Sequence, residues 1–136
     1  IHYFGNEIVA DYLRDHSVPT LMNLLLPNIL EVALFEFIEY VVHFGLHALD
    51  SPRHQDHHRS KELESVPVFI LPFVFLRFGH YGFAAGAWGY LISHRAGHKS
   101  NFFSHHRAHH ADPRYNFGVT TPFFDHVFGT YKASRR

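Results

Sequence analysis

Histidine is the residue type in this sequence with the greatest capacity for chemistry. It accounts for 15 of 136 residues, and most of these lie in four short motifs, HFGLH, HQDHH, HRAGH and HHRAHH. The paired histidines of these motifs are His43, His47, His54, His57, His58, His94, His98, His106, His109 and His110. Residues three or four positions apart lie on one face of a helix, so two such imidazoles can reach the same metal ion. Ten imidazoles exceed the needs of one ion and are about right for two five-coordinate ions.

The ligand set also bears on the identity of the metal. The sequence contains no cysteine, which excludes disulfides, thiolate zinc sites and cysteine-ligated iron–sulfur clusters. Imidazole binds zinc, copper, iron and nickel alike, but a zinc site needs only about three or four ligands. So many histidines beside apolar segments are more typical of redox chemistry with dioxygen. We therefore predict two iron ions, which zinc can replace in preparations because its affinity ranks above that of Fe²⁺.

Several residues near the motifs are candidates for supporting the metal ligands. Glu36 and Glu39 precede His43 on the same helix face. Either carboxylate can orient a ligand histidine through its second ring nitrogen, or lie near a substrate. His105 and Asp125 are further candidates for such a supporting role. For each carboxylate, an ordinary charge on a helix surface or in a loop is an equally good interpretation.

Two apolar regions must position these motifs. The first, 21–49, predicts a helix that begins near Pro27 and, at about 33 Å, can cross a bilayer core of about 30 Å. The second, 66–98, predicts a hairpin of two short helices, 67–78 and 81–98. The remaining parts are an N-terminal segment (1–20), a histidine-bearing loop (50–65) and a C-terminal histidine-rich cap (99–136). The sequence thus predicts a single all-α domain over 1–136.

The composition favours a membrane protein over a soluble one, with a buried helix pair in a soluble protein as the alternative. The chain has 15 Phe, and both apolar regions end in histidine motifs. Because the hairpin returns the chain, all four motifs are expected at one membrane surface. The Lys and Arg residues of the polar segments predict that this surface is cytoplasmic. With 12 basic and 12 acidic residues, the chain has no overall charge that would attract nucleic acid.

Over about 36–130 the sequence resembles the fatty acid hydroxylase superfamily, which includes the sterol desaturases. The resemblance is carried by HFGLH, HQDHH and HHRAHH, by Asn116-Phe117-Gly118, and by the DHVFGT segment from Asp125 to Thr130. Carotenoid hydroxylases share the histidine pattern, but the last two motifs point toward the sterol desaturase branch. The resemblance implies an integral-membrane, non-haem di-iron enzyme whose ligands are the ten histidines, with Asn116 as a further supporting residue. It also implies a separate electron donor of the cytochrome b5 or ferredoxin type.

The expected activity is dioxygen-dependent hydroxylation or desaturation of a lipid, whether sterol, fatty acyl chain or isoprenoid. Phe102, Phe103, Phe117, Phe123 and Phe124 are candidates for lining the substrate channel. Members of the superfamily usually have more residues before the first motif, so N-terminal membrane spans are expected to be missing here. A non-catalytic metal-binding subunit of a larger membrane complex is the alternative. A hydrolase that uses a bridging hydroxide is a second alternative.

Overall fold

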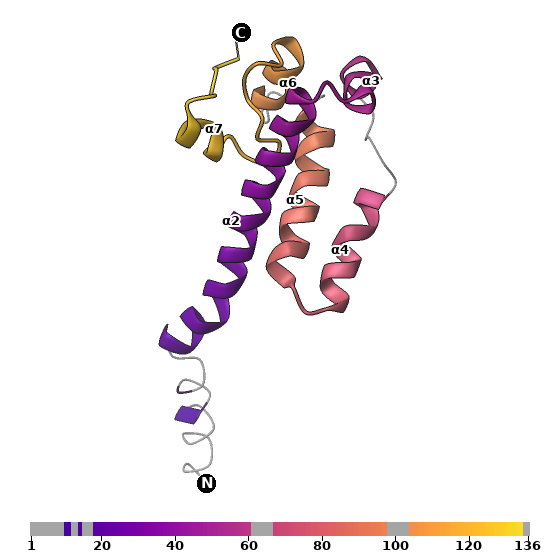
Figure 1. Cartoon of the computed structure of the whole chain (residues 1–136). Helices are drawn as coiled ribbons and strands as arrows, with labels where there is room; N and C mark the ends of the chain where they lie inside the picture. Colours follow the sequence, from indigo (N-terminus) through magenta and orange to yellow (C-terminus); the bar gives the residue numbers. More distant parts are fainter. Residues whose placement is uncertain (1–9, 12–13, 15–17, 61–66, 98–103, 135–136) are drawn as a thin grey trace.

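The computed structural model describes residues 10–11, 14, 18–60, 67–97 and 104–134. Within these ranges the regular secondary structure is helical, which confirms the predicted all-α class (Figure 1). The helices are α2 (Val18–Ala48), α3 (Pro52–Ser60), α4 (Pro67–Arg77), α5 (Tyr81–Gly97), α6 (Ser104–Ala111) and α7 (Phe123–Phe128). One predicted metal ligand, His98, lies outside the described residues. The same is true of Phe102 and Phe103, which were predicted to line the substrate channel.

The long helix α2 begins earlier than the sequence predicts. Pro27 was expected near its start, but the helix begins at Val18 and Pro27 lies inside it. Proline removes one N–H from the helical ladder, yet the apolar run continues on both sides of it. The Asn28 side chain donates a hydrogen bond to the Leu24 carbonyl oxygen at 2.9 Å and so occupies one acceptor beside the proline. The helix continues through the proline to Ala48.

The predicted histidine loop over 50–65 is partly wrong, because it contains the helix α3. Pro52 occupies its first position, where a proline costs no hydrogen bond. This nine-residue helix lacks an apolar stripe, and its buried residues are His54 and His57. The spacing of its histidines is helical, but the segment has no apolar periodicity, and a loop was therefore predicted.

The predicted hairpin is present, with α4 and α5 close to the expected bounds. Gly79 ends α4 in the left-handed region at φ 76°, and the His80 amide donates back to the Phe75 carbonyl oxygen at 2.9 Å. This is the usual way for a glycine to close a helix. The returning helix α5 then packs against both α4 and α2 (Figure 1).

Small residues allow α5 to approach α2 closely. A Cβ atom on Gly82 would overlap the carbonyl oxygen of Asn28, and one on Gly86 would lie 2.7 Å from the Phe35 ring. Helix pairs in membranes commonly approach through such small residues. The close contact sets the spacing of the two helices that carry the first and third histidine motifs.

The surface of α2 and α4 is apolar to a degree unusual for a soluble protein. Leu24, Ile29, Leu30 and Phe73 are each about 60% exposed. The segment Leu21–Ala48 is long and apolar enough to cross a membrane, with a mean hydropathy of 1.6. The other apolar helices are shorter; α5, with 17 residues, extends about 25 Å. Exposed apolar area on this scale marks a surface that contacts lipid or another protein.

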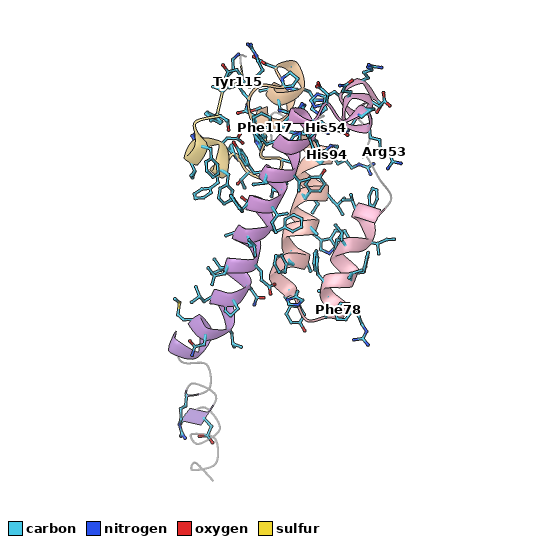
Figure 2. All side chains as sticks on the ribbon, viewed as in Figure 1. Arg53, His54, Phe78, His94, Tyr115 and Phe117 are labelled. Atoms are coloured by element: carbon cyan, nitrogen blue, oxygen red, sulfur yellow. The ribbon has the colours of Figure 1, made fainter. Side chains whose placement is uncertain are left out.

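The helices α3, α6 and α7 gather at the carboxyl-terminal end of α2, where α5 also ends, opposite the α4–α5 turn (Figure 1). Figure 2 shows His54, His94, Tyr115 and Phe117 at this end and Phe78 at the other. The returning hairpin therefore brings histidine motifs that are distant in sequence to one end of the helix bundle.

Candidate metal centre

Five histidines from three helices form a first group whose ring nitrogens converge. Its members are His43 and His47 of α2, His54 and His58 of α3, and His109 of α6. The Nε2 atom of His54 lies 2.8 Å from that of His47, 3.1 Å from that of His43 and 3.2 Å from that of His58. The Nε2 atoms of His47 and His109 are 2.9 Å apart. All five ligand atoms lie within 4.8 Å of one another.

This convergence fits a metal ion better than a set of hydrogen bonds. A neutral imidazole has one N–H donor and one acceptor nitrogen, so one Nε2 atom cannot form a proper hydrogen bond with three others at once. Nitrogens bound to a common zinc-sized ion at about 2.0–2.1 Å would lie about 3 Å apart along the edges of the coordination polyhedron. The observed separations of 2.8–3.2 Å match that spacing.

Three buried histidines form a second group beside the first. They are His57 of α3, His94 of α5 and His106 of α6. The Nε2 atoms of His57 and His94 are 3.1 Å apart. His110 adjoins this group, because its Nε2 atom lies 3.2 Å from that of His106. Eight of the ten predicted ligands thus fall into two groups and a ninth lies next to the second.

An irregular segment, residues 115–120, orients three histidines through its backbone. The ring N–H at Nδ1 of His109 donates to the Tyr115 carbonyl oxygen at 2.6 Å, and that of His43 donates to the Phe117 carbonyl oxygen. A carbonyl oxygen can only accept a hydrogen bond, so Nδ1 carries the proton and Nε2 keeps its lone pair. This is the arrangement by which proteins prepare a histidine for metal binding.

The third histidine held in this way is His105, whose Nε2 atom donates to the Val119 carbonyl oxygen at 2.9 Å. The carbonyl groups of residues 115, 117 and 119 thus each accept a hydrogen bond from a histidine. His105 was predicted to support the ligands, and the structure places it on α6 beside His106. It belongs to neither histidine group.

The carboxylates predicted to support the ligands instead hold this segment. Glu39 accepts hydrogen bonds from the Val119 and Thr120 amides and from the Thr120 hydroxyl. Glu36 accepts one from the Thr121 hydroxyl at 2.6 Å. Both carboxylates therefore tie α2 to the C-terminal cap.

Asp125 and Asn116 hold the other half of the segment. Asp125 is fully buried and accepts hydrogen bonds from the Phe117 and Gly118 amides, each at 2.8 Å. Asn116, at φ 59°, exchanges two hydrogen bonds with the backbone of Lys132, at 2.7 and 2.8 Å. Both residues act on the segment and so reach the histidines indirectly.

Burial keeps histidines of α6 neutral. It lowers the pKa of His106 well below its usual value, and the neighbouring imidazoles lower it further. Burial also lowers the pKa of His109 and of His105. Neutral imidazole is the form that binds a metal ion, so these rings need not lose a proton before they bind one.

An apolar cavity of about 270 Å³ adjoins both groups and runs between α2, α4 and α5. Its apolar walls include Phe35, Val42 and Leu46 of α2 and Val68 and Leu71 of α4. The histidines that reach it are His43, His54, His57, His94 and His106. The cavity therefore has apolar walls and is in contact with histidines of both groups.

The aromatic residues predicted to line a channel have other surroundings. Phe117 is buried, and its ring packs against those of His43 and His109, at 6.1 and 5.6 Å between ring centres. Phe123 and Phe124 line a separate apolar hollow between α2, α5 and α7. The cavity beside the histidines is instead lined mainly by aliphatic residues, with Phe35 and Tyr90 as its aromatic residues and Glu39 as a carboxylate.

Sequence reasoning missed the backbone acceptors and the hydroxyl groups around this centre. Backbone carbonyls leave no signature in side-chain types, so the roles of Tyr115 and Val119 were invisible. Thr130 and Tyr40 were also missed; their hydroxyl oxygens lie 2.8 Å apart. Thr130 is the last residue of the DHVFGT motif, and its place in that motif was the sequence feature that could have marked it as a residue near the centre.

No protein-family model, curated protein or solved structure matches this chain. The motif-based resemblance to the fatty acid hydroxylase superfamily thus remains a prediction, and the function must be argued from the site itself.

Proposed function

We propose that this chain is a membrane-bound di-iron oxygenase of the fatty acid hydroxylase type, which hydroxylates or desaturates a C–H bond of a lipid. The observation that carries the proposal is the position of the apolar cavity against both histidine groups. A metal centre intended only for structure has no need of such a cavity. A centre that oxidises an apolar substrate requires one.

The ligand chemistry supports two ions. The first group offers five imidazoles, and the second offers three with His110 adjoining. His98, the remaining histidine of the third motif, is the tenth proposed ligand and lies outside the described residues. Such nitrogen-rich sites suit iron and zinc alike, and the apolar substrate cavity favours iron.

When bound, two iron ions would supply the activation of dioxygen and the two-electron oxidation of the substrate. Hydroxylation consumes one C–H bond, one O₂, two electrons and two protons, and yields an alcohol and water. Desaturation consumes the same reagents, removes two hydrogens from adjacent carbons, and yields an alkene and two waters. The electrons come from a separate reduced carrier of the cytochrome b5 or ferredoxin type.

The chain's own residues bind and orient the reactants. The walls formed by Phe35, Val42 and Leu71 exclude water and hold an alkyl or isoprenoid segment against the histidines. Removing water strengthens the electrostatic interactions at the centre and prevents side reactions. The backbone carbonyl groups of residues 115–119 would keep the histidine rings in a fixed orientation while the substrate reacts.

The proposed location is an integral membrane position with the metal centre at the cytoplasmic surface. The segment Leu21–Ala48 supplies a helix of sufficient length. Exposed Arg53, Arg59, Arg95 and Arg107 belong to the elements at the histidine end. Basic residues next to membrane helices favour the cytoplasmic side, and they also suit an acidic electron carrier.

The test is dioxygen consumption by the protein extracted from membranes and loaded with Fe²⁺. Reduced ferredoxin or cytochrome b5 would be supplied together with sterol, fatty acyl or isoprenoid substrates. The proposal predicts a product one oxygen heavier or two hydrogens lighter, formed only with both dioxygen and reductant. Product formed without either reagent would favour the hydrolase alternative. Metal bound without turnover, with purification in fixed stoichiometry with other membrane proteins, would favour the subunit alternative.

A further inference from the structure

Asp125 is a fully buried carboxylate at the centre of a hydrogen-bond network that joins α2, α7 and the orienting segment. Its oxygens accept from the amides of Phe117 and Gly118 and, at 2.7 Å, from the Thr130 hydroxyl. Since the Thr130 proton points to Asp125, Tyr40 is the donor in the contact between the two hydroxyls. All hydrogen-bonding partners of this carboxylate are donors.

A single peptide unit connects Asp125 to His43. The carbonyl of Phe117 and the amide of Gly118 belong to the same planar peptide group. Its N–H donates to Asp125 at 2.8 Å, while its oxygen, on the opposite edge, accepts from His43 Nδ1. Because the group is rigid, fixing its N–H also fixes the acceptor that the histidine meets.

His109 is connected to the same network through another peptide group, the one between Tyr115 and Asn116. The Tyr115 carbonyl accepts from His109 Nδ1, and the Asn116 amide of that group donates to the Thr130 carbonyl oxygen at 2.9 Å. Thr130 is held in turn by Asp125, because its amide donates to the Asp125 backbone carbonyl oxygen at 2.8 Å and its hydroxyl donates to the Asp125 carboxylate at 2.7 Å. Two ligand histidines of the first group thus depend on the position of one aspartate.

We propose that Asp125 is a positioning residue that makes the first histidine group competent to bind metal, by holding the peptide groups that orient His43 and His109. This inference rests on the proposed metal-binding function. The carbonyls of Phe117, Tyr115 and Val119 go to His43, His109 and His105, which do not belong to the second group. Loss of Asp125 therefore affects one metal position and spares the other.

The substitution Asp125→Asn is a sharp probe because it preserves the shape of the side chain. Asn carries one acceptor oxygen and one NH₂ group, which can only donate. In either orientation its NH₂ group faces an amide N–H, that of Phe117 or that of Gly118. The peptide group that shifts is then either the one that carries the His43 acceptor, or the one that lies directly between the two groups that orient His43 and His109.

The experiment is titration of the metal-free, membrane-extracted protein with Co²⁺ alone, followed by visible absorption and by competition with a chelator. Wild type is expected to bind two Co²⁺ ions per chain. Asp125→Asn is expected to keep one site unchanged and to bind the other about 10–100-fold more weakly, the usual effect of removing an outer-shell partner. Asp112→Asn is the matched control, since Asp112 pairs on the surface with Arg114, and it should bind both ions as wild type does.

Thr130 provides a second route to the same answer if Asp125→Asn does not fold. Thr130→Val removes the hydroxyl donor, and Thr130→Ser restores it, so weak binding at one site should appear in the first variant and be rescued in the second. Equal affinity and identical spectra in Asp125→Asn and wild type would overturn the inference. Equal weakening at both sites would overturn it as well, because it would reveal a general loss of structure. Failure of wild type to bind Co²⁺ would instead overturn the proposed function itself.

Discussion

The two histidine groups are drawn from overlapping elements and yet are oriented in different ways. The first group includes His43 and His109, whose rings donate hydrogen bonds to carbonyl oxygens of the C-terminal cap. All three members of the second group are buried and line the apolar cavity. In the first group only His43 and His54 reach that cavity.

Under the proposed function, this difference would divide the work within one centre. Hydrogen bonds to a rigid backbone define a fixed coordination geometry, whereas a cavity wall places a metal position next to the substrate. The second group is therefore the one that we expect to face the reacting carbon.

The largest effects are expected from removing one ligand of each group. His43→Ala should abolish metal binding at the first position and His94→Ala at the second, so each variant should hold about one ion per chain. Both should lose dioxygen-dependent turnover, because the proposed chemistry needs both ions. Elemental analysis and turnover of the purified variants check this. His126→Ala, at an exposed histidine of α7, is the control and should keep both ions; two ions in either ligand variant would contradict the grouping.

Filling the cavity should affect turnover without affecting the metal. Leu71→Trp places an indole in the space beside the second group, and displacement of the substrate by about 1 Å can cost about 100-fold in rate. Leu76→Trp, on the same helix but away from the cavity, should have little effect. Turnover and metal content of both variants would be compared. Equal turnover in the two variants would mean that the substrate does not occupy this cavity.

A smaller effect is expected where α5 meets α2, far from both groups. Gly82→Ala drives a methyl group into the Asn28 carbonyl oxygen, and overpacking of this kind costs about 1–3 kcal/mol. Gly45→Ala has open space around its new methyl group, so it should be neutral or stabilise the helix by up to about 1 kcal/mol. Thermal unfolding in detergent checks the difference. A Gly82→Ala protein as stable as Gly45→Ala would contradict the close approach of the two helices.

The smallest effect is expected at the surface of the cap. Hydrogen bonds from Arg114 and then Lys132 hold the pKa of Asp112 below its usual value. Because the folded-state pKa is depressed, the stabilisation is present above pH ~4 and is lost as the pH falls toward the folded-state value. Asp112→Asn should lower the unfolding temperature slightly at pH 7, and the difference from wild type should shrink below pH ~4. A difference that grows on acidification would contradict this account of the ion pair.

The sequence predicted the parts of this molecule that depend on periodicity and on residue type. Helical spacing located the hairpin over 67–98 and collected the histidines that the structure brings together. The start of α2 was predicted too late because proline is common in the first turn of a helix, so Pro27 indicated the start. In the structure the apolar run before Pro27 is helical as well. The helix α3 was missed because its stability comes from tertiary contacts of His54 and His57, which local propensity does not report.

The supporting interactions of the centre were less predictable than its ligands. Glu39 and Asp125 were recognised as candidates, but their partners are backbone amides of residues 117–120, which no side-chain pattern records. The segment that orients His43 lies 74 residues away along the chain. Only the tertiary structure brings that segment against α2.

The most direct test of the central claim is the iron content of the native protein, extracted from membranes and measured by elemental analysis per folded chain. The presence of two histidine groups predicts close to two iron ions. The ions should be lost when His109 and His110 are both replaced by alanine. A folded chain that holds no metal, or that keeps its metal in the double variant, would contradict the claim that these histidines form a two-metal centre.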